Sequence, residues 1–248
     1  MAPGLEKNTI VLINENLEYF ADNSLGAALN WIYAPDNHSN IVDYVLFYPT
    51  NRESLSLTPN TPVSYDFLAG KFEGNTSQTV VFYYSPPRCL RLLDPEIDGA
   101  NRLIPDDSLL RDAAFLSSTA PILNEPTARM PQIYYPESAH AWCYYFQKAD
   151  LARQIGDWEQ VAALGDKAFA LTDYPNDPIE RFVFIEGYAH TAEWEKAVKL
   201  SEVSYKISKS FVGPPLCKLW GRIARETEGT QEQKVTMDIV QNKFECLP

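Results

Sequence analysis

The spacing of the apolar residues changes partway along the chain. Near the start, runs rich in β-branched and aromatic residues at positions 9–14 and 42–49 are typical of buried strands. Positions 23–34, between them, place apolar residues at helical spacing after a good capping residue, Asn23, and before Pro35. The order strand, helix, strand predicts a parallel, right-handed βαβ unit.

Further strand signals follow a polar, proline-containing loop. Positions 63–74 alternate in part between apolar and polar residues, and positions 77–85 are strongly β-prone. Pro86 and Pro87 come next, at the place where a hairpin turn is expected. Residues 1–95 are therefore predicted to form a small α/β domain with a short mixed sheet, too small for a complete doubly wound nucleotide-binding fold.

The rest of the chain divides into a connector and a helical region. Residues 96–136 are rich in Pro, Asp, Ser and Asn, with one short helix candidate at 106–116, and a connector this long usually packs across another domain. Residues 137–248 have helical spacing. We expect six helical segments, paired as three hairpins, at positions 137–156, 157–173, 177–191, 192–208, 213–229 and 230–244. The predicted fold class is α+β.

Two of these segments resemble each other at an offset of 36 residues, 156–169 with 192–205. Superposition pairs Trp158 with Trp194, Val161 with Ala197, Leu164 with Leu200, Ala168 with Ser204, and Phe169 with Tyr205. An acidic residue, Asp157 or Glu193, precedes each helix and favours its dipole. Each hairpin leaves an apolar face that only a neighbour can cover, so such units are expected to stack.

These hairpins resemble the tetratricopeptide repeat. The residues that carry the resemblance are Ala149, Gly156, Asp157, Trp158, Ala168, Tyr188, Trp194 and Ala197. Gly156 to Trp158 look like that family's Gly-Asp-aromatic turn, whereas Tyr145 in place of its Trp, Gly165 in place of an aromatic residue, and the 36-residue spacing depart from it. The resemblance implies a scaffold that holds a protein partner or braces the adjacent domain. The alternative is an unrelated array of α-hairpins.

A broader resemblance covers most of the chain. The segments 22–35, 86–95 and 140–169, taken in order, are similar to the soluble C-terminal part of bacterial multi-pass membrane proteins of the glycosyltransferase-like type. It implies an extracytoplasmic accessory domain whose partner is a protein or its own membrane domain, with any catalysis lying in that membrane domain. The alternative location is the cytoplasm.

Composition and charge narrow the classes of partner. The chain of 248 residues is 45% hydrophobic and 22% charged, which is typical of a globular protein. Its net charge of −12, without a cluster of basic residues, disfavours nucleic acid as a partner. We expect no membrane segment within this chain, because no apolar run reaches the roughly 20 residues that a membrane helix needs. The first residues also lack the features of a signal peptide.

The four cysteines include no CxxC pair, which disfavours a zinc knuckle or a thioredoxin-type site. They are either reduced thiols or two disulfides formed in an oxidising compartment. Three pairings are open in the second case. The order in the sequence and the helix layout favour Cys89 with Cys143 and Cys217 with Cys246.

Residues that could carry chemistry are few. The histidines at positions 38, 140 and 190 belong to no metal-binding motif, and neither a nucleophile elbow nor a phosphate-binding loop is present, so we expect no metal and no cofactor. The acids at positions 94, 96, 98, 106 and 107 are expected to be solvated or to cap helices, with a calcium site as the alternative.

One polar cluster has the position of a ligand site. Asn14, Glu15, Asp22 and Asn23 follow the carboxyl end of the first predicted strand, where ligands bind in many α/β units. Asn23 is equally suited to capping the helix. Two functions therefore remain: a non-catalytic interaction or accessory domain, favoured by the helical hairpins, and a small carbohydrate-active or ligand-binding enzyme that uses this cluster.

Overall fold

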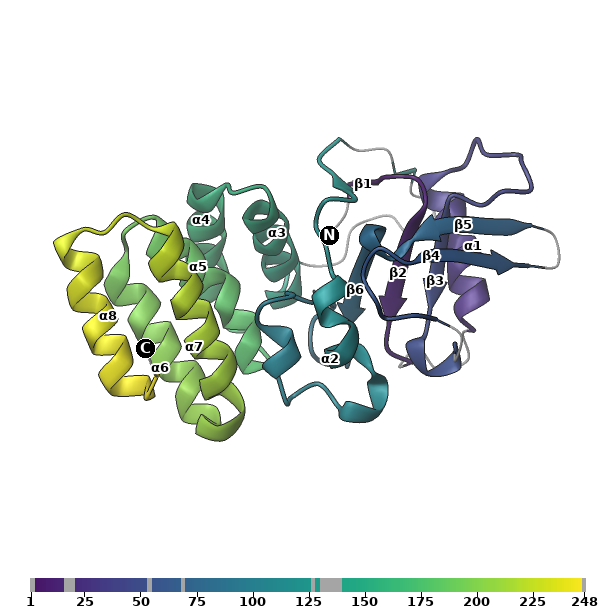
Figure 1. Cartoon of the computed structure of the whole chain (residues 1–248). Helices are drawn as coiled ribbons and strands as arrows, with labels where there is room; N and C mark the ends of the chain where they lie inside the picture. The colour runs from purple at the N-terminus through teal and green to yellow at the C-terminus, as the bar shows by residue number, and fades with distance from the viewer. Residues whose placement is uncertain are drawn as a thin grey trace.

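The computed structural model describes residues 3–15, 21–52, 55–67, 70–125, 128–129 and 140–246. It confirms the α+β fold, with small sheets formed by the first part of the chain and an array of helices formed by the last part. Figure 1 shows the sheets at one end of an elongated molecule, the helical array at the other, and the short helix α2 (Leu110–Ala113) between them. Each region has its own main hydrophobic core, and Cys89 and Ile97 of the first region belong to the core of the array.

The main sheet is mixed, with strand order β3-β2-β6-β7. Its strands are β2 (Thr9–Ile13), β3 (Tyr44–Phe47), β6 (Thr79–Tyr83) and β7 (Arg91–Leu92). The central strand β2 is parallel to both β3 and β6, and helix α1 (Asp22–Tyr33) connects β2 to β3, which confirms the parallel βαβ unit. Strand β7 is antiparallel to β6 and follows a turn that contains the cis Pro86–Pro87 bond, so the hairpin prediction is confirmed.

The prediction that Asn23 caps the first helix is wrong. Helix α1 begins one residue earlier, at Asp22, and its N-cap is Ala21, with no capping hydrogen bond from a side chain. The side-chain oxygen of Asn23 instead accepts a hydrogen bond from Arg52, at 3.1 Å.

Two smaller sheets flank the main one. Strands β4 (Pro62–Asp66) and β5 (Lys71–Asn75) form a hairpin, and β1 (Gly4–Leu5) pairs with β8 (Ile122–Leu123). The second pair joins the start of the chain to the end of the segment that follows β7.

The segment 96–125 contributes to the core of the α/β region. Ile104, Leu110 and Ala114 are buried against the residues of β2, β3 and β6. The helix candidate at 106–116 is interrupted: α2 spans Leu110–Ala113, with short 3-10 turns on either side. Leu109 separates the first turn from α2 because its left-handed backbone, at φ 56°, cannot continue a helix.

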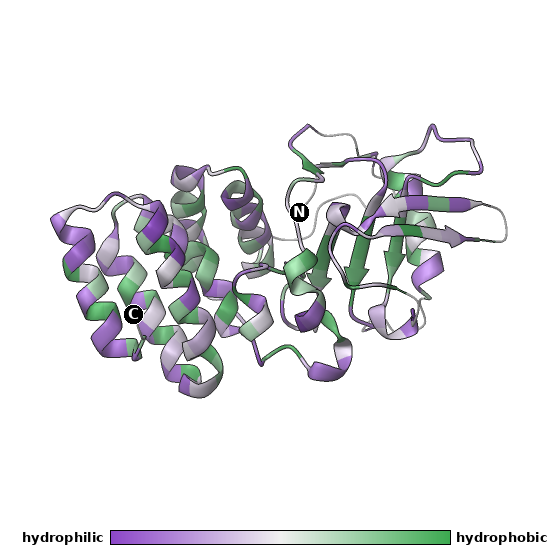
Figure 2. Cartoon of the chain, in the orientation of Figure 1, coloured by the Kyte–Doolittle hydropathy of each residue, from purple (hydrophilic) through white to green (hydrophobic). Residues whose placement is uncertain are grey.

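The last part of the chain forms the expected six helical segments. The helices are α3 (Trp142–Gln154), α4 (Trp158–Phe169), α5 (Phe182–His190), α6 (Trp194–Ile207), α7 (Lys209–Glu226) and α8 (Gln231–Phe244). Helix α7 begins before its predicted start, so that Pro214 and Pro215 lie inside it. Figure 2 shows apolar and polar residues alternating along α7 and α8, as expected for helices with one packed face, whereas every residue of α5 from Phe182 to Ala189 is buried.

The turns that precede α4 and α6 have the same backbone geometry. Gly156 and Ala192 both adopt a left-handed conformation, at φ 72° and φ 61°. The next residue in each turn, Asp157 or Glu193, donates its backbone N–H to the carbonyl five residues earlier, at 3.0 Å and 2.7 Å. Both helices then begin at a tryptophan. The sequence echo thus corresponds to two hairpins with one kind of turn.

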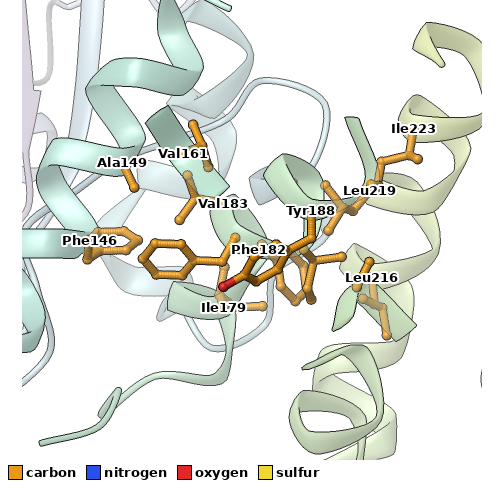
Figure 3. Packing of buried hydrophobic residues seen from close by; sticks show 14 of the residues in the cluster. Phe146, Ala149, Val161, Ile179, Phe182, Val183, Tyr188, Leu216, Leu219 and Ile223 are labelled. Atoms are coloured by element: carbon orange, nitrogen blue, oxygen red, sulfur yellow. The ribbon is translucent and has the colours of Figure 1, made fainter. Parts of the chain in front are cut away.

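Small residues allow the helices of the array to approach closely. Ala149, Ala168 and Ala197 are completely buried. A Cβ atom on Gly165 would lie 2.7 Å from the Tyr188 hydroxyl, and one on Gly187 would lie 2.3 Å from Val161 Cγ1. Figure 3 shows how side chains from α3, α4, α5 and α7 meet in this core.

Candidate functional site

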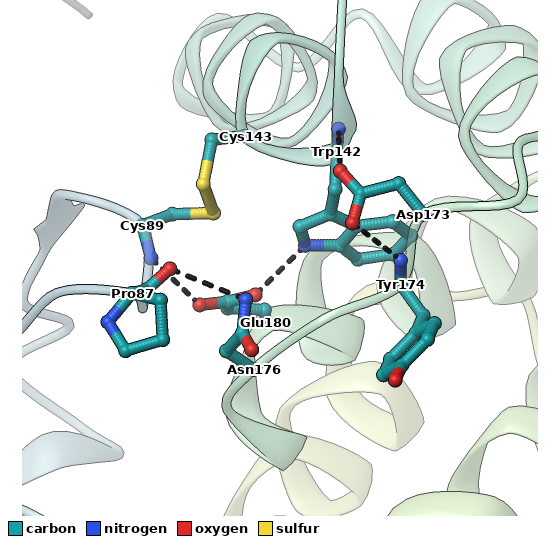
Figure 4. Close-up of a disulfide and its surroundings, with 8 residues drawn as sticks. All are labelled: Pro87, Cys89, Trp142, Cys143, Asp173, Tyr174, Asn176 and Glu180. Atoms are coloured by element: carbon teal, nitrogen blue, oxygen red, sulfur yellow. Dashed lines mark hydrogen bonds between the residues drawn. A yellow bond between two sulfur atoms is a disulfide. The ribbon is translucent and has the colours of Figure 1, made fainter.

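The two regions are joined covalently where the turn after β6 meets α3. Cys89 and Cys143 form a disulfide, and Cys217 forms a second one with Cys246, so both predicted pairings are confirmed. Figure 4 shows the first disulfide beside Glu180, whose carboxylate accepts hydrogen bonds from the Cys89 backbone N–H at 2.8 Å and from the Trp142 indole at 2.7 Å. Burial raises the pKa of Glu180. The buried Glu180 carboxylate therefore hydrogen-bonds both to the α/β region, at Cys89, and to the helical array, at Trp142.

A buried ionic network forms the second connection. Asp94, just after β7, accepts hydrogen bonds from Arg222 of α7 at 2.6 Å and from Arg153 of α3 at 3.4 Å. Arg222 also donates to both oxygens of Glu186 in α5, at 2.7 Å and 3.1 Å, and Arg153 donates to Asp150 at 3.1 Å. Three helices of the array thus converge on one loop of the α/β region.

The two arginines in this network offset part of its negative charge. Burial alone would raise the pKa of Asp94, but Arg153 and Arg222 outweigh it and hold that pKa below its usual value. Glu186 behaves in the opposite way, because burial outweighs the two arginines and raises its pKa. A cavity of about 40 Å³, room for about one water molecule, lies among these groups.

Two of the acids that were expected to be solvated are instead buried. Asp94 is nearly buried, and Asp98 is completely buried, where it accepts two hydrogen bonds from Arg91, at 2.8 Å and 2.9 Å. The prediction was wrong for these two residues because their arginine partners in the fold neutralise the carboxylates. Asp94 and Arg222 lie 128 residues apart, so local sequence carries no sign of the pair.

Asn14, one of the residues of the predicted ligand site, hydrogen-bonds to the backbone just beyond the end of β6. Its side-chain amide donates to the Tyr84 carbonyl at 2.7 Å, and its side-chain oxygen accepts the Tyr84 N–H at 2.8 Å. These bonds extend the pairing of β2 with β6 beyond the ends of both strands. Asn14 therefore contributes to the sheet, while the neighbouring Glu15 is exposed.

Asp22 and Asn23 are both bound by Arg52, a residue that no sequence pattern singled out. Arg52 donates to Asp22 at 2.6 Å and to Asn23 at 3.1 Å, and its guanidinium lies over the rings of Phe47 and Tyr65. Within the described part of the chain, the buried Asp22 Oδ2 and Arg52 Nε atoms make no hydrogen bond. A pocket of about 200 Å³ is lined by Arg52, Phe47 and Tyr65, together with the hydroxyl residues Ser56, Thr61 and Ser64 and the apolar residues Leu55, Pro62 and Val63.

The signature residues of the hairpins have structural roles. Asp157 caps α4 by accepting from the Gln160 N–H at 3.1 Å, and Gly156 forms the turn before it. Tyr188 donates its hydroxyl to Asp166 at 2.8 Å, and its pKa is raised by burial and by that carboxylate.

A groove opens between the N-terminal ends of α6 and α8. Its volume is about 680 Å³, and its lining includes Trp194, Val235 and Ile239. Val235 is 48% exposed and Ile239 is 38% exposed. Glu195 and Glu232 also line it, as do Glu193 and Lys196, which form an ion pair with each other. This surface therefore combines an apolar floor with acidic groups.

The two tryptophans of the hairpin turns differ in how they are covered. Trp158 is stacked on His190, with ring centroids 3.8 Å apart and an angle of 7°. At the same 36-residue offset from His190 stands Glu226, which lies 3.5 Å from His190. No aromatic ring of the described residues stacks on Trp194, which instead lines the groove.

Comparisons with known proteins do not identify the chain. No family model matches it, and neither a curated protein nor a solved structure is significantly similar to it. Among the described residues, no helix has both the length and the apolar character needed to cross a membrane.

Proposed function

We propose that this chain is a non-catalytic interaction or accessory domain in which tetratricopeptide-like hairpins brace the α/β region and bind a protein partner. The observation that carries this proposal is the junction. A disulfide, the Glu180 hydrogen bonds and the Asp94 network attach one loop of the α/β region to α3, α5 and α7. Such buried, fully occupied polar groups support a fixed orientation of the two regions better than they support a reactive centre.

The groove between α6 and α8 supports the partner-binding part of the proposal. Exposed apolar residues beside a partly exposed tryptophan are typical of interaction sites. The carboxylates of Glu195 and Glu232 favour a partner segment that carries basic residues next to its apolar ones. A basic side chain on such a segment could stack on Trp194, as His190 stacks on Trp158.

The disulfides support an extracytoplasmic location, because such bonds persist in oxidising compartments. Together with the whole-chain sequence resemblance, this leads us to propose that the domain belongs to a membrane glycosyltransferase-like protein. The partner is then a separate protein or the membrane domain of the same polypeptide.

Photo-crosslinking from the groove tests this function. A photoreactive amino acid at Val235 is expected to give a defined cross-link in cells, either to one other protein or to another part of the same polypeptide. Ile239→Asp should weaken that cross-link by placing a charge on the apolar floor. The same probe at Phe115, which is 50% exposed and far from the groove, is the control. Equal labelling from both positions would contradict a partner site in the groove.

A second candidate is the binding of a small ligand beside Asp22. The unsatisfied Asp22 Oδ2 and Arg52 Nε, together with the two aromatic rings of the adjacent pocket, favour it. Aromatic faces and hydrogen-bonding groups of this kind suit a sugar. Binding of mono- and disaccharides, measured by NMR, should be lost in Tyr65→Ala if this candidate is correct. Spectra unchanged by every sugar would reject it.

A further inference from the structure

Three potential metal ligands meet on the side of the array next to the ionic network. Glu186 and His190 lie four residues apart on α5 and therefore face the same way. Glu226, at the end of α7, lies opposite them. One ligand atom from each of the three side chains lies within 4.8 Å of the other two. A search of the sequence for paired histidines could not find this group, because its third member comes from another helix.

His190 is held as a metal ligand would be. Its side chain is only 9% exposed, and its ring is fixed by the stacking on Trp158. The buried Nε2 atom has no hydrogen-bond partner among the described residues, and it lies 3.5 Å from Glu226 Oε2. Two atoms bound to a tetrahedral zinc ion at about 2.1 Å lie roughly 3.4 Å apart. The spacing of nitrogen and oxygen therefore already matches that of two zinc ligands.

Negative charge exceeds positive charge around these side chains, which favours the binding of a cation. Both oxygens of Glu186 accept hydrogen bonds from Arg222, but each carboxylate oxygen has a second lone pair. In the connected cluster, two guanidinium groups face four carboxylates, namely Arg153 and Arg222 against Asp94, Asp150, Glu186 and Glu226. A divalent cation would balance this excess of negative charge.

We propose that Glu186, His190 and Glu226 form a binding site for a divalent transition metal, with Zn²⁺ as the best match to one imidazole and two carboxylates. The side chain of Glu226 is 46% exposed, so it can rotate toward the ion and leave a path for its entry. The bound ion would connect α5 to α7. This proposal does not depend on the partner groove.

Metal titration of the folded, oxidised chain tests the site. After dialysis against a chelator and then buffer, Co²⁺ is added and its visible ligand-field absorption is followed, and Zn²⁺ is then titrated by calorimetry. We expect one ion per chain, with Zn²⁺ displacing Co²⁺. Glu226→Gln should lower the Zn²⁺ affinity at least tenfold, because it removes a charged ligand from an exposed position without changing side-chain size. His190→Gln should do the same.

Glu232→Gln is the matched control, since Glu232 is an exposed glutamate outside the cluster. Its affinity for Zn²⁺ should equal that of the unaltered chain, and circular dichroism should show all three variants folded. Absence of stoichiometric binding would overturn the proposal. So would an affinity that Glu226→Gln leaves unchanged, or that Glu232→Gln lowers equally.

Discussion

The replacement Asp94→Asn tests whether the ionic network holds the two regions together. Asp94 Oδ1 accepts the backbone N–H groups of Glu96 and Ile97, at 2.9 Å and 3.3 Å, while Oδ2 faces Arg153 and Arg222. An asparagine that keeps the two backbone bonds must turn its NH₂ group toward the two guanidiniums. Two ion pairs are then replaced by contacts between donors.

The size of the effect follows from burial. Removing one partner of a buried ion pair costs about 3–5 kcal/mol. Both arginines keep a second carboxylate, Glu186 or Asp150, and the Asp94 side chain is 11% exposed. We therefore expect a loss near the lower limit, about 3 kcal/mol in the free energy of unfolding. For a chain of this size, that corresponds to a fall in Tm of about 6–12 °C.

Glu96→Gln provides a closely matched control. Glu96 lies two residues further along the same loop and pairs with Arg225 of the same helix, α7, but the two side chains are 38% and 61% exposed. Exposed pairs contribute less than about 1 kcal/mol. Urea unfolding, followed by circular dichroism and by tryptophan fluorescence, gives both free energies.

The pH dependence supplies a second readout. Because the pKa of Asp94 is lowered in the folded chain, its stabilisation is present above the unfolded pKa of about 3.9 and is lost as the pH falls through the folded pKa. The difference between the unaltered chain and Asp94→Asn should therefore be constant near neutral pH and shrink below about pH 4. Equal losses for Asp94→Asn and Glu96→Gln, or a difference that grows in acid, would refute the assigned role of Asp94.

Three further predictions concern packing, turns and the disulfide, each measured by urea unfolding. Gly165→Ala should cost about 1–3 kcal/mol, because its Cβ would meet the Tyr188 hydroxyl at 2.7 Å and Phe184 Cδ1 at 2.9 Å, whereas Gly221→Ala should stabilise α7 by about 0.5–1 kcal/mol since its nearest neighbour is the flexible end of Arg225. A loss in both variants would contradict this. Ala192→Gly should raise the free energy of unfolding by about 1 kcal/mol and Gly156→Ala should lower it by about as much, because the backbone is left-handed at both positions. Changes of the opposite sign would be inconsistent with the turn geometry. Replacing Cys89 and Cys143 together by serine should cost about 4 kcal/mol, given their sequence separation of 54, and a loss below about 1 kcal/mol would show that this bond does not constrain the chain.

Local patterns predicted most of the secondary structure, although not the short strands β1 and β8. The parallel unit from β2 to β3, the hairpin at Pro86 and Pro87, and the six helical segments all follow from the spacing of apolar residues and from turn residues. The one interrupted helix, at 106–116, depends on the left-handed Leu109, a residue type that rarely adopts this conformation. The composition of this segment does not indicate that one of its residues adopts a left-handed backbone.

The polar sites depend on contacts between distant segments and were predicted less completely. Asp22 and Asn23 were recognised from their place after the first strand, but Arg52, which binds both, gave no local signal. Asn14 was expected near a ligand, and its side chain hydrogen-bonds to Tyr84, 70 residues away, which no local pattern predicted. The burial of Asp94 depends on Arg222, on the other side of the junction. Such partners become visible only when the chain is folded.

The central claim is that the helical array braces the α/β region so that the two behave as one unit. Differential scanning calorimetry of the chain with both disulfides intact tests it most directly. We expect a single transition whose van't Hoff enthalpy equals the calorimetric enthalpy, because unfolding either region must break the Asp94 network and expose the junction. Two separate transitions, one for each region, would contradict the account.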